Sequence, residues 1–453
     1  MGAAADRLQL SYPRTDHGSA RPLFASGFLR GEAEALLGRR VQAEDFDEID
    51  ADWFVRLPGG RIGASELDDA LDHLDYDRTL VEQMPAEAIP VVSAARPAVA
   101  RGRTAWIARR FDPLLTPYDG GLTEPSLHAL EAHPKLNGPT PPSAFERYAQ
   151  CGLQFFLSRV LGLRALEEPE DLPRMTPMDR GSLVHRILER VLTELLPDDP
   201  PAEPRRVTHL QLIDRIAAEE FGLAEARGLT GHPQLWEIDK SVMGAELRLW
   251  YDEEVLSAGD RHWDSAAFEV SYGIPLGEDP HPLSTVEPVP LTFGTRTVQL
   301  SGKIDRLQWD ARGRGFAVID YKTGRQRDKK SATFDGGRAL QLPLYLHGAG
   351  HLLGRPPTDG TAEYFYVSRR GNFARHEMTG PTLAESSEAF EQIMGAFAEG
   401  MFGGLYPARP EARMCGYCDF RGLCPHPAEH VDRMKSKESD PRLEDIQKAL
   451  QVP

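Results

Sequence analysis

VIDYKTGR, residues 318–325, places a carboxylate and an ammonium, Asp320 and Lys322, two positions apart directly after an apolar run. A short apolar run of this kind is typical of a buried β-strand. Because side chains alternate along a strand, Asp320 and Lys322 face the same way, about 6.6 Å apart along the chain, and Tyr321 faces the other way. The stretch therefore predicts a charged pair on one face of a buried strand.

An earlier stretch, VQLSGKIDRLQW at residues 298–309, predicts a second strand, which the turn-like DARGRG joins to the first. This hairpin sets Asp305 beside Asp320, and two adjacent carboxylates raise each other's pKa unless a cation lies between them. Mg²⁺ is usually held by one or two carboxylates together with substrate phosphate oxygens. We therefore expect Asp305, Asp320 and the carbonyl of Tyr321 to bind Mg²⁺ or Mn²⁺. Lys322 then activates a water or neutralises the transition state.

The alternative explanation of this hairpin is structural. Neighbouring opposite charges also occur as plain ion pairs on surface hairpins. A lone exposed ion pair does not need Val318 and Ile319 packed behind it, so the apolar context favours the metal site.

Helical and strand-like patterns surround the hairpin. GSLVHRILERVLTELL, residues 181–196, carries an apolar stripe at helical spacing, with His185 beside the stripe. FEVSYGIPL, residues 268–276, predicts a strand, and LQLPLYLHGAGHLL, residues 340–353, predicts a helix despite Pro343. Together these patterns predict an α/β fold with a short mixed sheet flanked by helices.

The composition along the chain suggests three parts. Residues 1–135 have helical patches and no motif that indicates catalysis or metal binding. Residues 136–430 carry the acidic, lysine, histidine and cysteine motifs, and residues 431–453 form a charged tail. The segment NGPTPPSAFERY changes from a Pro-rich linker to a helix start, where Ser143 and Glu146 have the spacing of a capping box. We expect a domain boundary in this linker.

The formal charge of −17 at first argues against a nucleic-acid partner, because phosphate binding depends on Lys and Arg. The segment from Ser301 to Leu340 is an exception, with ten basic residues, Arg325 among them, against five acidic ones. A solvated surface is the simplest explanation, and phosphate binding is the other. No apolar stretch approaches the length of a membrane span, and the N-terminus lacks the hydrophobic region of a signal peptide. We therefore expect a cytoplasmic protein without a membrane partner.

Four cysteines occur in the chain, and three of them lie within ten residues. Cys415, Cys418 and Cys424 have C-x2-C-x5-C spacing, and Cys151 lies far upstream. A disulfide framework is not expected in a large cytoplasmic protein. Four thiolates fit either a tetrahedral zinc ion or an iron-sulfur cluster.

The motifs around Asp305 and Asp320 resemble the core of the PD-(D/E)XK nucleases, and more narrowly the RecB-type nuclease domain. The resemblance implies a restriction-endonuclease-like fold in which an Asp on one strand precedes an Asp-x-Lys on the next. GSLVHRILE is similar to the Gly-x-x-x-His helix of these proteins, which implies that His185 is a further metal ligand. Glu269 lies where many relatives carry an acid.

QLPLY, in turn, is similar to a helical Gln-x-x-x-Tyr element of the same proteins. The resemblance implies that Gln341 and Tyr345 bind substrate beside the active site. Arg325 and the basic segment around it are expected to steer phosphates. Gln341 and Tyr345 also fit the surface and the core of an ordinary amphipathic helix.

The cysteines and the N-terminal region resemble AddB-type nucleases. In that family one Cys before the nuclease core and three after it hold a [4Fe-4S] cluster, which implies that Cys151 and the three later cysteines do so here. The Ser-Tyr-Pro-Arg segment near the N-terminus resembles the stretch after the last helicase motif of AddB-like and UvrD-like proteins. The sequence has no G-x-x-x-x-G-K-[ST] motif, so it is not an ATP-driven helicase on its own. Residues 1–135 resemble a helicase remnant or linker, and the chain as a whole resembles the C-terminal part of an AddB-like helicase-nuclease, either cut from a longer protein or encoded separately.

These resemblances imply a metal-dependent DNA nuclease. The expected activity is exonucleolytic trimming of single strands at duplex ends, supplied by an AddA-like or UvrD-like helicase subunit during double-strand-break repair and recombination. Two alternatives remain at this point. One is a catalytically silent DNA-binding scaffold of a recombination complex, and the other is an endonuclease of a defence system.

Overall fold

The chain divides into two compact units, Met1–Arg101 and Gly102–Pro453. The computed structural model describes residues 10–14, 23–55, 64, 66–70, 72–164, 174–196, 198–257, 263–277, 280–313, 315–326, 333–424 and 427–453.

The described part of the first unit is helical. It holds α1 (Gly27–Leu37), α2 (His73–Gln83) and α3 (Pro85–Ala95), and α4 (Pro97–Phe111) begins in it. Ser26 caps α1 by accepting a hydrogen bond from the N–H of Leu29, and Asp72 caps α2 in the same way. The expectation of a mainly helical N-terminal region is therefore confirmed.

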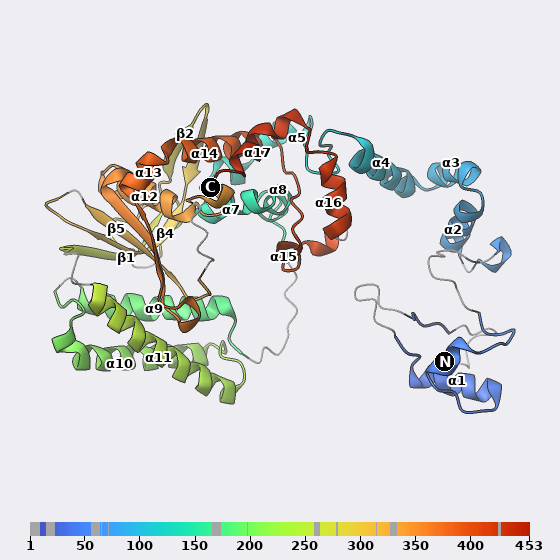
Figure 1. Ribbon diagram of the computed structural model, residues 1–453, viewed down its shortest axis with the longest axis horizontal. Helices are drawn as coiled ribbons and strands as arrows, with labels where there is room; N and C mark the ends of the chain where they lie inside the picture. The colour runs from blue at the N-terminus through green and yellow to red at the C-terminus, as the bar shows by residue number, and fades with distance from the viewer. Residues whose placement is uncertain are drawn as a thin grey trace. The chain divides into compact units, whose positions relative to one another are not determined.

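A five-stranded mixed sheet forms the centre of the second unit (Figure 1). Its strand order is β1-β4-β5-β6-β7, where β5 and β6 run parallel and the other neighbours run antiparallel. The strands are β1 (Ser265–Tyr272), β4 (Gly302–Trp309), β5 (Phe316–Lys322), β6 (Gly360–Tyr366) and β7 (Arg375–Thr379). The helix α12 (Gln341–Leu353) makes the connection that parallel strands require between β5 and β6.

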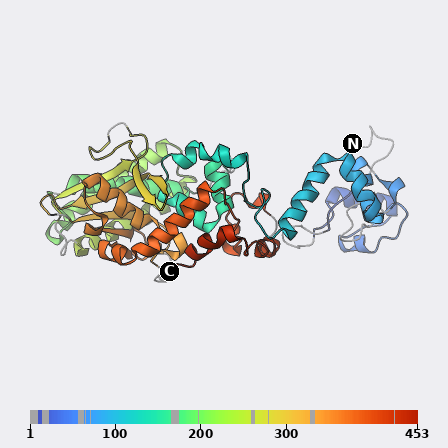
Figure 2. The same ribbon diagram turned by 90° about the horizontal axis from the view of Figure 1, so that it is seen from above.

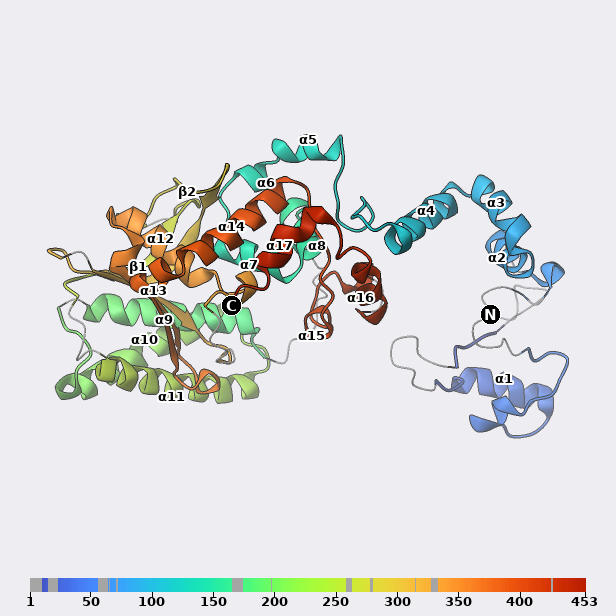
Figure 3. The same cartoon turned by 45° about the horizontal axis from the view of Figure 1, so that its top comes forward.

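Helices cover both faces of the sheet. On one face lie α9 (Pro177–Leu195), α10 (Arg206–Ala226) and α11 (Pro233–Ser257), drawn in green beneath the strands in Figure 1. Seen from above, the yellow and orange strands overlie these green helices (Figure 2). The other face is covered by α12, by α14 (Ser387–Phe402), which packs on α17 (Glu444–Ala449) (Figure 3), and by shorter helices. Of the shorter helices, α7 (Pro142–Gln150) contacts α12 and α14, and α13 (Gly380–Glu385) contacts α14 and β7. The second unit also contains α5 (Ser126–Glu131), α6 (Pro134–Asn137), α8 (Gly152–Phe155) and α15 (Ala412–Cys415).

The central position of β5 follows from its sequence. Its first six residues are buried, as expected for a strand covered on both faces. Val318 packs in the core that includes α12 and α14, whereas Ile319 and Tyr321 pack in the core formed with α9, α10 and α11. The predicted α/β fold with a short mixed sheet between helices is confirmed.

The prediction of one continuous strand at residues 298–309 was wrong. The segment forms β3 (Arg296–Leu300), which pairs with β2 (Val289–Phe293) in a separate two-stranded sheet, and then β4. The chain changes sheets at Ser301, whose N–H donates to the carbonyl of Thr140. At the next position the ring of Tyr272 lies so close to Gly302 that a Cβ there would meet its hydroxyl at 2.6 Å. Only a glycine therefore fits this crossing point.

The capping box predicted for Ser143 and Glu146 was also wrong. Ser143 lies inside α7, whose N-cap is Pro141 without a side-chain hydrogen bond. The carboxylate of Glu146 instead accepts hydrogen bonds from the N–H groups of Leu340 and Gln341, at 3.0 and 3.2 Å. Glu146 thus satisfies the first N–H groups of α12, which have no partner inside that helix. Sequence spacing identified a capping residue but assigned it to the wrong helix.

The helix predicted at residues 340–353 is confirmed as α12. Pro343 lies at its third residue, within the first turn, where a missing N–H costs no intrahelical hydrogen bond.

The C-terminal segment packs against residues near the start of the second unit. Lys437 follows α16 (Pro427–Lys435), and its ammonium donates to the carbonyls of Ala108, Asp112 and Leu114 at 2.9, 2.6 and 2.9 Å. It also forms an ion pair with Asp119 at 3.0 Å. The side chain of Lys437 is 1% exposed, so this buried cation fixes the C-terminal segment against residues 108–119. The division into residues 1–135, 136–430 and 431–453 stays a prediction.

We expect Lys437→Met to destabilise the protein by about 3 kcal/mol, because it leaves the carboxylate of Asp119 buried without its cation. Denaturant unfolding followed by circular dichroism measures the change. Lys448→Met is the control, because the side chain of Lys448 is exposed and pairs with Glu444 on the surface, and it should cost much less stability than Lys437→Met. Equal losses in the two variants would contradict this account of Lys437.

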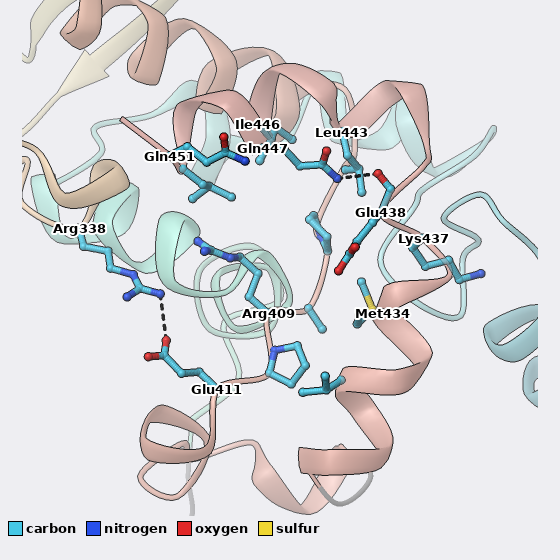
Figure 4. A pocket seen from close by; sticks show the side chains of 15 residues that line it. Arg338, Arg409, Glu411, Met434, Lys437, Glu438, Leu443, Ile446, Gln447 and Gln451 are labelled. Atoms are coloured by element: carbon cyan, nitrogen blue, oxygen red, sulfur yellow. Dashed lines mark hydrogen bonds and ion pairs between the residues drawn. The ribbon is translucent and has the colours of Figure 1, made fainter. Parts of the chain in front are cut away.

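A cavity of about 600 Å³ lies between the segment from Pro407 to Glu411 and the helices α16 and α17 (Figure 4). Arg409 and Arg338 line it, and Arg338 donates to Glu411 at 2.9 Å. None of the residues predicted for the active site lines this cavity. Within the described residues, no helix is both long enough and apolar enough to span a membrane.

Candidate metal and nuclease site

Asp305 and Asp320 lie where the pairing of β4 with β5 ends. The last paired residues are Arg306 and Ile319, and the two aspartates come next on their strands. Beyond that point the N–H of Tyr321 donates to Asp305 Oδ2 at 2.8 Å. A side-chain carboxylate thus binds the backbone of the neighbouring strand, and the predicted site lies where the strand ladder stops.

Three potential metal ligands converge beside this point. His185 on α9, Glu269 on β1 and Asp305 on β4 each offer one ligand atom, and these atoms all lie within 4.8 Å of one another. His185 Nδ1 is 3.4 Å from Asp305 Oδ1, and His185 Nε2 is 3.0 Å from the carbonyl oxygen of Tyr321. The structure therefore brings together three of the predicted ligands, His185, Asp305 and the Tyr321 carbonyl, with Glu269, the position at which many relatives carry an acid.

Glu269 has an unusual backbone conformation. Its φ is 52°, although it lies inside a strand and is not a glycine. Its neighbours Phe268 and Val270 pair normally with Arg306 and Ile304. Residues other than glycine seldom adopt a positive φ, because the Cβ atom then crowds the backbone. Backbone strain of this kind is concentrated at functional sites. The strain supports a functional role for Glu269, which the sequence resemblance alone indicated only by position.

Gln341 connects the charged groups on β5. Its Nε2 donates to Asp320 Oδ1 at 2.8 Å, and its Oε1 accepts a hydrogen bond from Lys322 Nζ at 3.0 Å. Its Nε2 also donates to the hydroxyl of Tyr345 at 3.0 Å, and that hydroxyl donates to the carbonyl of Lys303 at 3.1 Å. Asp320 and Lys322 therefore face α12 together, as the strand alternation predicted. Gln341 and Tyr345 order these groups, and their contact with DNA stays a prediction.

Lys322 is held from three sides. Besides Gln341, its ammonium forms an ion pair with Asp320 Oδ2 and lies 5.0 Å from the ring centroid of Tyr364. Its side chain is 34% exposed, so the ammonium is accessible to a substrate.

Arg325, the other predicted cation, is exposed just beyond β5. Its role in binding phosphates stays a prediction. Residues 314 and 327–332, which carry much of the predicted basic segment, lie outside the described residues.

Burial and neighbouring charges shift the pKa values of the site. Burial raises the pKa of Asp320 to about 6, with the charge of Asp305 adding to the increase and the ammonium of Lys322 opposing it. For His185, burial lowers the pKa, but the hydrogen bond to Asp305 and the nearby carboxylates raise it above its usual value. The pKa values of Asp320 and His185 are thus both raised above their usual values, and such shifts are common at functional sites.

These residues fit a divalent metal ion. Carboxylate oxygens are preferred ligands of Mg²⁺ and Mn²⁺, and an imidazole is a usual ligand of transition metals such as Mn²⁺. Burial raises the pKa of Asp320 most, and the charge of Asp305 adds to the increase, so a divalent cation between the two carboxylates would stabilise their ionised forms. Asp320 is not one of the three residues whose ligand atoms converge within 4.8 Å, so its role as a ligand stays a prediction.

We expect the affinity for Mg²⁺ to weaken as the pH falls through about 6. Below that pH Asp320 holds a proton that must leave before the carboxylate binds a metal, so each lost pH unit costs up to about tenfold in affinity. His185 also binds metal only when neutral, and its raised pKa extends the dependence to higher pH. Calorimetric titration with Mg²⁺ between pH 5 and 8 measures the effect. An affinity that stays constant over this range would contradict the prediction.

The pKa of Cys424 shows that the other three cysteines lie near it. Burial raises the pKa of Cys424 to about 11, and the charges of Cys151, Cys418 and Cys415 add to the shift. Cys151, more than 260 residues upstream, therefore lies near the three later cysteines. In the described parts of the chain, the sulfurs do not form a group within 4.8 Å of one another, and no disulfide is present. The cluster that these cysteines were predicted to hold stays a prediction.

Sequence reasoning missed one charged partner of the site. Lys303 forms an ion pair with Glu269, one of the three converging residues. The pairing of β1 with β4 places Lys303 opposite Ser271, two residues from Glu269. No sequence pattern gives this register, so only the folded sheet identifies the pair.

Comparison with known proteins agrees with this geometry. A stretch of 207 residues, 45% of the chain, is 23% identical to an ATP-dependent helicase/deoxyribonuclease subunit of Clostridioides difficile (strain 630). The match covers 17% of the length of that protein. Residues 140–425 match the PD-(D/E)XK nuclease superfamily, and they contain all of the converging ligands, Asp320, Lys322 and Gln341. Because the match covers more than half of its 453 residues, the chain belongs to the PD-(D/E)XK nuclease superfamily.

Proposed function

We propose that this chain is a divalent-metal-dependent deoxyribonuclease that hydrolyses phosphodiester bonds. The observation that carries the proposal is the convergence of His185, Glu269 and Asp305 within 4.8 Å, beside the carboxylate of Asp320 and the ammonium of Lys322. An anionic ligand set next to an accessible cation suits a metal ion and a phosphate group together.

Each residue has a separate task in this proposal. His185, Asp305, Asp320, Glu269 and the carbonyl of Tyr321 hold Mg²⁺ or Mn²⁺. The ion, when bound, lowers the pKa of a water and stabilises charge on the phosphate oxygens. Lys322 lies at the edge of the ligand set, where its ammonium orients the attacking water or neutralises the developing charge. Gln341 fixes the positions of the Lys322 and Asp320 side chains relative to each other, because it forms a hydrogen bond with each of them.

DNA at duplex ends is the proposed substrate, with a helicase as partner. The relative from Clostridioides difficile is named as a helicase/deoxyribonuclease subunit, and the present chain has no G-x-x-x-x-G-K-[ST] motif of its own. In this proposal an AddA-like or UvrD-like helicase subunit supplies single strands, which the nuclease trims exonucleolytically in the cytoplasm during break repair.

The four cysteines are proposed to hold a [4Fe-4S] cluster with a structural role. A cluster bound by Cys151, Cys415, Cys418 and Cys424 cross-links the start of the nuclease core to its end, and closing so long a loop restricts the unfolded chain. Iron analysis and absorbance near 400 nm after anaerobic purification test this assignment. If the purified protein is colourless and contains one zinc per chain, the four cysteines hold a zinc ion and the iron-sulfur assignment is wrong.

A time course on end-labelled and circular DNA tests the proposed activity. We expect Mg²⁺-dependent release of nucleotides from linear single strands, and none when the metal is chelated. Cleavage of circular single strands would identify an endonuclease instead. Binding of DNA without cleavage in any divalent metal would favour a silent scaffold.

A further inference from the structure

A buried charge network lies directly behind the proposed metal site. Arg306, the residue after Asp305, donates through Nη1 to both carboxylate oxygens of Glu254 on α11, at 3.1 and 3.0 Å. The same nitrogen donates to the hydroxyl of Tyr321 at 3.1 Å. All three side chains are buried, so the contacts form away from solvent. Nothing in the sequence motifs around Asp305 and Asp320 involves Glu254.

Tyr321 connects this network to the metal ligands through its backbone. Its N–H donates to Asp305 Oδ2 at 2.8 Å, and its carbonyl lies 3.0 Å from His185 Nε2. Its ring also makes an edge contact with the imidazole of His185, with centroids 6.1 Å apart. One residue thus contacts two proposed ligands, and its own carbonyl is a third. A displacement of Tyr321 moves all three.

The side chain of Tyr321 is the part that fixes its position. Its ring packs in the core of α9, α10 and α11, near Phe365, and its hydroxyl has Arg306 as its hydrogen-bond donor. Glu254 holds that arginine and is also 3.5 Å from Arg375 Nη2. A buried arginine needs a carboxylate partner, so the position of Arg306 depends on Glu254.

We propose that Glu254 and Arg306 act as positioning residues that hold Tyr321, and through its backbone Asp305 and His185, in the arrangement that binds the divalent ion. The inference rests on the proposed metal-dependent function. It assigns an effect on the metal site to Glu254 on α11, which lies 51 positions before Asp305 in the sequence. Partners that orient metal ligands typically contribute about 10- to 100-fold to metal affinity or activity.

Metal affinity tests the inference without relying on cleavage. We expect Tyr321→Phe, which keeps the backbone groups and removes only the hydroxyl, to weaken Mg²⁺ binding about fivefold by calorimetry. Glu254→Gln should weaken it about 10-fold or more. The double variant should bind about as weakly as Glu254→Gln alone, because both changes disrupt the same path through Arg306. The Mg²⁺ concentration that gives half-maximal cleavage should rise in parallel.

Glu220→Gln provides the matched control. The side chain of Glu220 is as buried as that of Glu254, 6% against 5% exposed, and it too pairs with two arginines, Arg186 and Arg190. None of these contacts involves Tyr321. We expect Glu220→Gln to lower the melting temperature, although less than Glu254→Gln because Arg186 and Arg190 are partly exposed whereas Arg306 is buried, and to leave Mg²⁺ affinity unchanged.

The outcomes separate this inference from the function on which it rests. Unchanged Mg²⁺ affinity in both Tyr321→Phe and Glu254→Gln overturns the positioning role while the nuclease proposal stands. An equal loss of affinity in Glu220→Gln also overturns it, because the effect then follows from general destabilisation. A native protein that neither binds Mg²⁺ nor cleaves DNA removes the proposed function and the inference together.

Discussion

Asp320→Asn should abolish DNA cleavage and, at the same time, stabilise the protein. We expect the cleavage rate to fall at least about 10³-fold, because the substitution removes an anionic oxygen that the proposed metal site requires. The amide still accepts the hydrogen bond from Gln341, so the local structure is kept. DNA binding should change little.

The stabilisation follows from the pKa of Asp320. Burial raises that pKa to about 6 in the folded protein, whereas the unfolded chain has the ordinary value of 3.8. Between about pH 3.8 and about pH 6 the folded protein keeps the proton on Asp320 and the unfolded chain loses it, so the free energy of unfolding falls as the pH rises. Above pH 6 the whole of this loss of stability remains. A neutral asparagine escapes this penalty, so the gain at pH 7 in metal-free buffer is up to about 3 kcal/mol. At pH 4 the gain should almost vanish.

Asp310→Asn is the control for both effects. Asp310 lies at the other end of the same hairpin, is partly exposed and accepts a hydrogen bond from the N–H of Arg312. Its pKa is lowered by backbone hydrogen bonds, so the same substitution should slightly destabilise the protein and leave cleavage unchanged. Native cleavage by Asp320→Asn would refute the assignment of the site, and a loss of stability at pH 7 would refute the account of its pKa.

The elements that carry the site were predictable because their signals are local. The apolar run before Asp320 gave β5, the apolar stripe around His185 gave α9, and residue spacing placed Gln341 one helical turn from Tyr345. Each of these patterns depends on which residues of a single helix or strand are buried, and the spacing of apolar residues along the sequence shows this directly. The convergence of His185 with Asp305 came from the family resemblance, since no local pattern joins residues 120 positions apart.

The contacts between elements were not predictable in the same way. Glu146 has the spacing of a capping residue, but the helix that it caps begins almost 200 residues later. The burial of Lys437 has no signal in the sequence either, because residues 431–453 show only a charged segment, whereas in the structure the carbonyls of Ala108, Asp112 and Leu114 accept hydrogen bonds from its ammonium. Hydrogen-bond partners so distant in sequence are fixed by tertiary packing, which overrides local preference.

The strand pair β2 and β3 was missed for a different reason. Prolines at positions 288 and 290 argue against a strand, but the pair forms a small separate sheet in which a missing N–H is tolerated at an edge. Its turn is made by Gly294, which has a φ of 57°. The strain at Glu269 was equally hidden, because no sequence pattern marks a left-handed residue inside a strand.

Lys322→Met should lower the cleavage rate about 10²- to 10³-fold while the protein still binds Mg²⁺. The substitution keeps the length and packing of the side chain beside the ring of Tyr364 and removes only the ammonium. Because that ammonium lowers the pKa of Asp320, its loss raises this pKa further. The pH at which Mg²⁺ binding weakens should therefore move upward, which calorimetry at several pH values measures.

Lys303→Met is the matched control, because Lys303 also forms an ion pair with a carboxylate of the site, that of Glu269. Its side chain is 52% exposed, and it has no contact with Asp320 or Gln341 among the described residues, so we expect a loss of cleavage of less than about fivefold. If Lys322→Met cleaves DNA within fivefold of the native rate, the ammonium serves only to balance charge on Asp320. If Lys322→Met and Lys303→Met lose cleavage equally, the reaction requires only positive charge near the carboxylates. The position of the Lys322 ammonium beside Gln341 would then have no special role.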